Sequence, residues 1–149
     1  MNYDFMNIAF LEAEKAFKAG EVPIGAVIVK DGKVIAKAYN MKEKKKSAIY
    51  HAEILAILMA CKKLKSWRLE NCDMYVTLDP CPMCASAIKQ SRIKNVFSAL
   101  PNADANNTFI IKEIFEKDKI NSGVNFISDL SITRSETLLQ KFFELQRKK

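Results

Sequence analysis

The sequence of 149 residues contains no apolar run as long as a membrane span requires, which is about 18 residues. Residues 1–10 include Asp4 and lack the basic segment of a signal or transit peptide, so we expect the protein to be cytoplasmic. Glycine and proline number only four each, which excludes collagen-like and low-complexity chains. Repeats and linkers are also missing, and the length is typical of a single domain spanning residues 1–149.

Histidine occurs once, and the four cysteines are expected to be thiols or metal ligands, since disulfides are rare in the cytosol. The chain needs neither disulfides nor metal merely to fold. Its residues are 49% apolar, and a chain of this length can bury roughly two thirds of its unfolded surface. The formal net charge of +7 permits binding to nucleic acid or to anionic surfaces but does not indicate it by itself.

Apolar periodicity and turn residues predict alternating helices and strands. Helices are expected at 3–19, 52–64, 82–90, 108–117 and from 133 onward, and strands at 24–29, 34–39, 74–78, 93–100 and 124–127. The pair Asp31-Gly32 predicts a type I′ hairpin between the first two strands. This order predicts an α/β fold in which helices cover both faces of a sheet.

Three segments carry more specific expectations. The basic segment 41–47 and the segment 101–107 are predicted to be exposed loops. The helix at 52–64 is apolar over most of its circumference, which is typical of a buried helix. The residues Thr133 to Glu136 fit a capping box that opens the last helix, whose apolar face is expected to include Phe142 and Phe143.

The residues with the clearest chemical potential open two predicted helices. His51 begins the motif His51-Ala52-Glu53, and 30 positions later comes Pro80-Cys81-Pro82-Met83-Cys84. If the two helices lie side by side on the sheet, one imidazole and two thiolates meet, which are ligands that Zn²⁺ prefers. Three protein ligands leave a fourth position for water, as in catalytic zinc sites.

The other two cysteines do not fit this group. Cys61 lies about 15 Å further along its helix than His51, and Cys72 is expected at the opposite end of its strand from Cys81. Both are interpreted as small apolar side chains in the core.

Glu53 can point toward a metal-bound water without being a ligand. A carboxylate in that position can take a proton from the water and pass it to a leaving nitrogen. H-x-E combined with P-C-x-x-C is the pattern of zinc nucleobase deaminases. A redox role for C-x-x-C, a capping or core role for His51 and a first-turn role for Glu53 would each explain only one part of this pattern.

The chain resembles the cytidine deaminase-like zinc enzymes and, among them, the bacterial tRNA adenosine deaminases. The likeness covers nearly the whole chain and rests on residues 21–26, 40, 51–54, 67–69, 75–85, 91–93 and 142–147. It implies a three-layer α/β/α fold around a five-stranded mixed sheet, and a homodimer whose sites are completed near the interface. It also implies one zinc ion per chain, held by His51, Cys81 and Cys84, with Glu53 as the proton shuttle.

The resemblance further implies the substrate, which would be the wobble adenosine in the anticodon stem-loop of a tRNA. Zinc-bound hydroxide would convert it to inosine and release ammonia. Asn40 would hydrogen-bond the flipped-out base, and backbone groups near Ala52 and Pro80 would line the pocket. The remaining substrate contacts implied are Pro23, Phe143 and Arg147. Candidates for contacts with phosphates are Lys42, Lys44, Lys45, Lys46 and Arg147.

Two segments depart from the pattern of the tRNA enzymes and keep alternatives open. Ser47-Ala48-Ile49-Tyr50 replaces Asp-Pro-Thr-Ala, and residues 99–107 lack the glycine-rich loop that meets RNA. One alternative is therefore a zinc-dependent deaminase of a free nucleobase or nucleotide, such as guanine or cytosine. Another is a non-catalytic zinc-stabilised module, which the presence of Glu53 disfavours. The basic run 42–46 and the basic end 147–149 are also open to interpretation as solvated surface.

Overall fold

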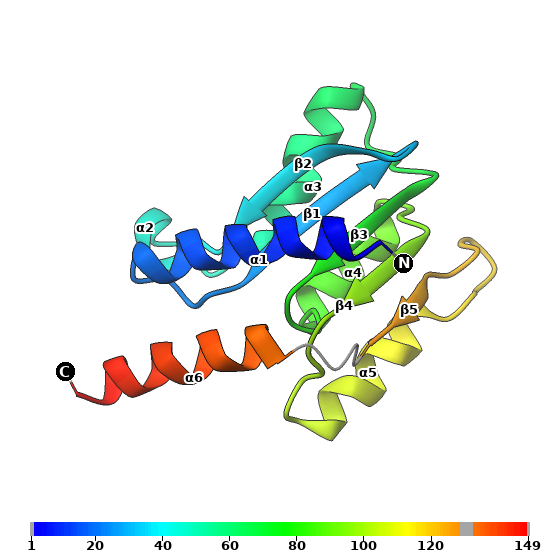
Figure 1. Ribbon diagram of the computed structural model, residues 1–149. Helices are drawn as coiled ribbons and strands as arrows, with labels where there is room; N and C mark the ends of the chain where they lie inside the picture. Colours follow the sequence, from blue (N-terminus) through cyan, green and yellow to red (C-terminus); the bar gives the residue numbers. More distant parts are fainter. Residues whose placement is uncertain (1, 129–132, 149) are drawn as a thin grey trace.

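The computed structural model describes residues 2–128 and 133–148, with the side chains of 133–135 excepted. Helices and strands alternate along most of the chain (Figure 1). The elements are α1 (Tyr3–Lys18), β1 (Gly25–Lys30), β2 (Lys33–Tyr39), α2 (Lys42–Lys45), α3 (Ala52–Leu64), β3 (Cys72–Val76), α4 (Pro82–Gln90), β4 (Asn95–Ser98), α5 (Ala105–Phe115), β5 (Asn125–Ile127) and α6 (Thr133–Arg147).

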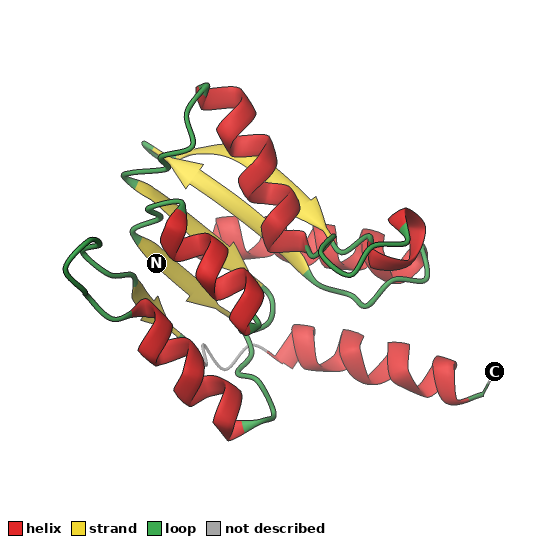
Figure 2. Ribbon diagram, turned by 180° about the vertical axis from the view of Figure 1, so that it is seen from behind, coloured by secondary structure: helices red, strands yellow, loops and turns green. Residues whose placement is uncertain are grey.

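The five strands form one mixed sheet in the order β2-β1-β3-β4-β5. β1 pairs antiparallel with both β2 and β3, whereas β3, β4 and β5 run parallel. α3, α4 and α5 cover one face of the sheet (Figure 2), and α1 covers the other, with α6 in contact with α1. The expected three-layer α/β/α fold with a five-stranded mixed sheet is confirmed.

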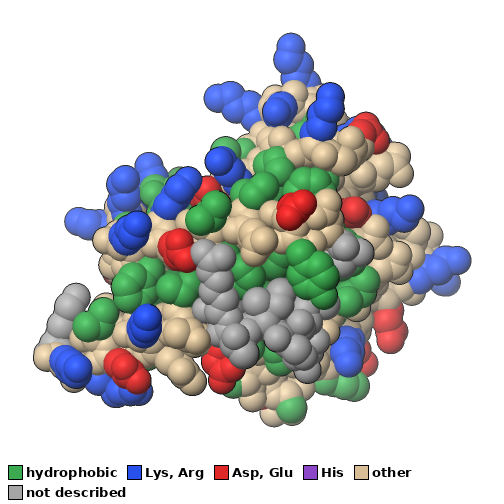
Figure 3. All heavy atoms as spheres, viewed as in Figure 1, with side chains coloured by type: hydrophobic (Ala, Val, Ile, Leu, Met, Phe, Trp, Pro, Cys, Tyr) green, Lys and Arg blue, Asp and Glu red, His purple; other side chains and the backbone are tan. Residues whose placement is uncertain are grey.

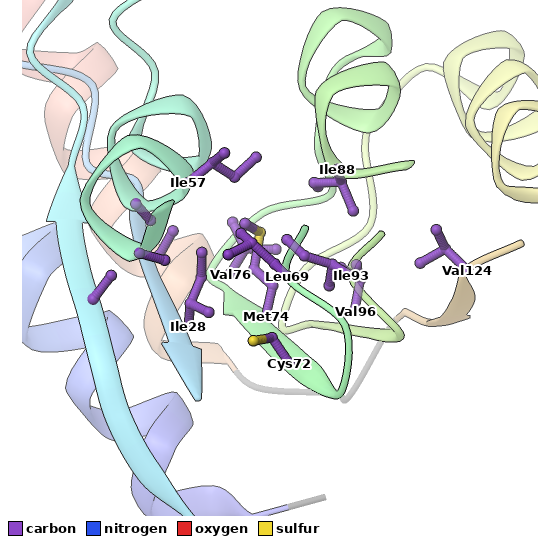
Figure 4. Close-up of a cluster of buried hydrophobic side chains, with 14 of the residues drawn as sticks. Ile28, Ile57, Leu69, Cys72, Met74, Val76, Ile88, Ile93, Val96 and Val124 are labelled. Carbon is purple, nitrogen blue, oxygen red and sulfur yellow. The ribbon is translucent and has the colours of Figure 1, made fainter. Parts of the chain in front are cut away.

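The sheet is buried on both faces because alternate side chains of β1 enter two different apolar clusters. Ala26 and Ile28 belong to the larger cluster beneath α3 and α4 (Figure 4), and Val27 and Val29 belong to the cluster beneath α1. Gly25 lies so close to α1 that a Cβ atom there would collide with the backbone of Ala9 and Ala13. The tight contact fixes α1 against the start of β1.

The predicted hairpin between β1 and β2 is confirmed. Asp31 and Gly32 have φ angles of 51° and 73°, and positive φ at both central residues is what a type I′ turn requires. Other boundaries differ from the expectation. β3 begins at Cys72, before the predicted 74–78, and β4 is limited to Asn95–Ser98 within the predicted 93–100.

Both predicted loops contain helix, so these two expectations are wrong. α2 lies inside the segment 41–47 because the buried Glu21 carboxylate accepts hydrogen bonds from the backbone N–H groups of Glu43 (2.9 Å) and Lys44 (2.8 Å). α5 already begins at Ala105, because the Asp104 side chain caps it by accepting from the N–H of Asn106 at 2.9 Å.

Two predicted apolar faces are only partly buried. The helix at 52–64 is confirmed as α3, but Leu58 and Met59 are 59% and 48% exposed, so its complete burial was predicted wrongly. In α6, the Phe142 side chain is buried, whereas the Phe143 side chain is half-exposed. The predicted capping box includes side chains 133–135, which lie outside the described residues. No helix among the described residues is long and apolar enough to cross a membrane.

Candidate metal centre

α3 and α4 bring their N-termini together on the same face of the sheet (Figure 2). His51 is the N-cap residue of α3, and Cys81 is the N-cap residue of α4. Pro82 occupies the first turn of α4, where its missing N–H has no intrahelical partner, and Cys84 follows in the same turn. The predicted convergence of the two motifs is therefore what the fold produces.

The three side chains form a compact group. Nδ1 of His51 lies 3.7 Å from Sγ of Cys81 and 3.5 Å from Sγ of Cys84, and the three atoms all lie within 4.8 Å of one another. A tetrahedral ion with Zn–S bonds of ~2.3 Å and Zn–N bonds of ~2.0 Å separates such nitrogen and sulfur ligands by about 3.5 Å. The group therefore fits a zinc ion, and one ligand position remains for water.

Neither N-cap side chain caps the helix that it precedes. The side chains of His51 and Cys81 make no capping hydrogen bond, although N-cap residues commonly do so. The two side chains contact each other instead. This contact favours the interpretation of His51 as a metal ligand over its interpretation as a helix cap. The helix N-termini add positive potential, which favours thiolates at this position.

Hydrogen bonding prepares Cys81 as a ligand. Contacts with Cys84 and with His51 lower the pKa of the Cys81 thiol to about 4 despite its partial burial. The same contact with Cys81 raises the pKa of His51. The pKa of Cys84 is raised, because its thiol is hydrogen-bonded to Cys81 and is buried. The hydrogen bonds that lower the pKa of Cys81 favour its thiolate, which is the form of cysteine that binds a metal ion.

Glu53 is buried beside this group, with 4% of its surface exposed. Its Oε1 atom has no hydrogen-bond partner among the described residues. Burial raises the pKa of the carboxyl group. Because an unpaired buried carboxylate oxygen is costly, this atom is a ready acceptor for a proton on a molecule bound at the metal centre.

Cys61 and Cys72 lie apart from the metal centre, as expected. Neither belongs to the group of possible ligands, and all four cysteines are free thiols. Cys72 is buried, whereas Cys61 is half-buried, so only Cys72 is fully part of the core. Burial raises the pKa of both thiols, which makes them weaker metal ligands than Cys81.

Asn40, Pro23 and Ala52, which the resemblance assigns to the substrate, are all buried. The Asn40 side chain accepts a hydrogen bond from the N–H of Lys42 at 3.3 Å and donates to the carbonyl of Val22 at 3.4 Å. Ala52 is the first residue of α3, directly after His51. These contacts fasten the segment before β1 to α2.

Phe143 and Arg147 lie on α6 and line an open hollow together with Leu100 and Pro101. None of the three possible metal ligands lines this hollow. The structure therefore brings the metal group and Glu53 together but leaves these two predicted contacts on a separate surface.

Two further buried carboxylates were not singled out from the sequence. Glu21 holds α2, and Asp79 hydrogen-bonds the segments that follow β4 and β5. Their partners lie more than 20 positions away along the chain, so no local sequence pattern could have found them.

The comparisons with known proteins find deaminases. The family model for the cytidine and deoxycytidylate deaminase zinc-binding region matches residues 1–100. The tRNA-specific adenosine deaminase of Bacillus subtilis (strain 168) is 42% identical over 147 residues, covering 97% of this chain and 90% of that protein. The enzyme of the same name from Aquifex aeolicus (strain VF5) is 41% identical over 144 residues, covering 96% and 94%.

Solved structures agree with this similarity. A structure reported in work on A-to-I editing by tRNA:A34 deaminases at the wobble position has a TM-score of 0.81 at 35% identity, covering 93% of this chain and all of that one. A guanine deaminase from Bacillus subtilis has a TM-score of 0.67 at 36% identity, covering 97% and 95%.

Proposed function

Because the chain belongs to the cytidine and deoxycytidylate deaminase zinc-binding family, we propose that it deaminates the wobble adenosine of a tRNA anticodon loop to inosine. One observation supports hydrolytic deamination as the type of reaction. Glu53 has a buried oxygen without a hydrogen-bond partner among the described residues, and it lies beside a His51, Cys81 and Cys84 group that fits zinc. The choice of substrate is supported by full-length similarity to tRNA-specific adenosine deaminases. A tRNA substrate would also place the protein in the cytoplasm.

Glu53 is the catalytic residue of this proposal. Zinc held by His51, Cys81 and Cys84 would supply a Lewis acid that lowers the pKa of the attacking water. The Glu53 carboxylate accepts a proton from that water while the water oxygen forms a bond to C6 of adenine. The protonated carboxyl donates this proton to the ring nitrogen N1. It then takes the remaining proton from the oxygen now bonded to C6 and passes it to the amino group, so that the C6–N bond breaks, ammonia leaves and a carbonyl remains at C6. Its raised pKa, which follows from burial, keeps this second, acidic role accessible.

Asn40 is proposed to hold the base once it has left the loop stack. An asparagine amide has two N–H donors and an oxygen with two lone pairs. The contacts with Val22 and Lys42 use one of each and fix the orientation of the side chain. The remaining donor and lone pair can then bind the edge of the adenine, with Pro23 and the start of α3 at Ala52 beside it.

The RNA outside the base is proposed to contact a rim formed by α2 and α6. Lysine and arginine side chains gather at the end of the molecule where α2 and the C-terminal half of α6 lie (Figure 3). Phe143 is half-exposed and can stack on a base, while Arg147 and the α2 lysines can bind phosphates. Splaying a base out of a single-stranded loop costs less than extracting it from a duplex.

The test is deamination of an anticodon stem-loop with adenosine at the wobble position, followed by mass spectrometry. We expect inosine at that one position, and none in a stem-loop with guanosine there. The second candidate substrate is free guanine, because the guanine deaminase of Bacillus subtilis is 36% identical over nearly the whole chain. Protein that holds one zinc per chain, makes no inosine and converts guanine to xanthine would overturn the tRNA proposal.

We also propose that the protein is a homodimer. Leu58 and Met59 expose an apolar surface on α3, the helix that begins at the metal centre, and a second copy would cover it. Light scattering should give the mass of a dimer for the wild type and a lower mass for Met59→Glu. The control is Leu11→Glu, which changes an equally exposed apolar residue on α1. A monomeric wild type would contradict the proposal.

A further inference from the structure

Asp79 is a buried carboxylate that stands two positions before Cys81, and only 3% of its surface is exposed. Its Oδ2 atom accepts the backbone N–H of Asn102 at 3.2 Å, and its Oδ1 atom accepts the hydroxyl of Ser128 at 2.6 Å. Its own N–H donates to the carbonyl of Leu100 at 2.8 Å. Both carboxylate oxygens are therefore used to hold other parts of the chain.

These contacts join three segments that follow neighbouring strands. Asp79 follows β3, Leu100 and Asn102 follow β4, and Ser128 directly follows β5. Because β3, β4 and β5 are parallel neighbours, the three segments emerge at the same edge of the sheet. The Asp79 side chain and its backbone N–H tie the three segments together beyond the last residues of the strands.

The two sides of this junction lead to different parts of the proposed active site. On one side, the chain continues from Asp79 through Pro80 to the possible ligand Cys81. On the other, Leu100 lines the hollow that Phe143 and Arg147 of α6 also line. Asp79 thus connects the metal-binding loop to the floor of the surface where RNA is proposed to bind.

We infer that Asp79 is a positioning residue that sets the hollow beneath α6 at a fixed place relative to the metal centre. The inference rests on the proposed function, since it takes this hollow as part of the substrate-binding rim. Asp79 does not reach the reacting atoms in this role. It fixes the position of the hollow relative to the metal centre, and so determines how tightly an RNA loop is bound while its base lies at that centre.

Three variants separate the contacts. Asp79→Ala removes both acceptors. Ser128→Ala removes only the bond to the segment after β5. Asp79→Asn can keep both bonds, because the amide oxygen accepts from Asn102 and the amide N–H groups donate to the Ser128 hydroxyl, which can also act as an acceptor. Glu12→Gln is the matched control, since Glu12 is equally buried but lies on α1, where it pairs with Lys15.

The measurement is the KM and kcat of each variant, with zinc content determined alongside. For the anticodon stem-loop we expect Asp79→Ala to raise KM by about tenfold and Ser128→Ala by about threefold, because each leaves polar groups without partners. Asp79→Asn should restore a KM near that of the wild type, and Glu12→Gln should not change it. kcat and one zinc per chain should be kept throughout. Hydrogen exchange at the Asn102 amide should be faster in Asp79→Ala only.

Unchanged KM in both Asp79→Ala and Ser128→Ala would overturn the inference, and so would loss of zinc and kcat without a change in KM. If Asp79→Ala does not fold, the other two variants provide the test. The inference then requires a higher KM in Ser128→Ala than in Asp79→Asn, and equal KM values would overturn it. The substrate that the wild type converts tests the proposed function separately. A wild type that converts only guanine would overturn both the proposed function and the inference, whereas inosine formation with an unchanged KM in the variants would overturn the inference alone.

Discussion

The metal centre and the substrate rim are built from different kinds of interaction. The possible ligands and Glu53 come from two short motifs, each at the first turn of a helix that packs on the sheet. The rim formed by α2 and α6, with residues 100–104 beside α6, consists of short or exposed segments. The buried carboxylates of Glu21 and Asp79 hold α2 and residues 100–104 through hydrogen bonds that span 22 and 23 positions of sequence.

This difference separates the chemistry from substrate selection. Helix N-termini on a packed sheet hold their side chains rigidly, so the metal centre can keep the same geometry in enzymes that act on different bases. Segments held by a few long-range hydrogen bonds can change without disturbing that centre. Substitutions in the two regions should therefore give different signatures, in kcat and zinc content for the centre and in KM for the rim.

The largest effect is expected from removing a metal ligand. Cys84→Ala should reduce zinc from one per chain to none and abolish deamination, because two remaining ligands cannot hold the ion with the required geometry. Cys61→Ala is the control, since Cys61 lies outside the ligand group. Metal analysis and the inosine assay measure both properties. Equal zinc in the two variants would mean that the ligand set is assigned incorrectly.

Glu53→Ala should give the next largest effect, a loss of about 10²–10⁴-fold in kcat, as expected for removing a general acid–base. Zinc should remain bound, because Glu53 is not in the ligand group. The affinity for the stem-loop should stay near that of the wild type, which single-turnover kinetics and binding titrations can establish. Normal turnover in this variant would exclude the proton-transfer role.

The same contrast explains what could be predicted from the sequence. His51, Cys81 and Cys84 were recognised because metal binding requires fixed residue types at fixed spacings, and the helices that carry them follow from local signals such as Pro82. α2 was missed because its cap is Glu21, which no local pattern links to Glu43. The exposure of Met59 was missed because apolar periodicity does not reveal whether a helix face contacts the sheet or the outside.

The smallest effect concerns the basic end of the rim. Replacing Lys44 and Lys45 of α2 by glutamine should weaken stem-loop binding and reduce the slope of log affinity against log salt by about 1.4, if both contact phosphates of a single-stranded loop. The control replaces Lys117 and Lys119, two exposed lysines between α5 and β5, and changes the net charge equally. The segment between α5 and β5 lies at the other end of the molecule from α2 (Figure 1). Equal loss of slope in both pairs would show that the RNA senses only the overall charge, whereas a loss confined to α2 would mark the rim as a defined phosphate-binding surface.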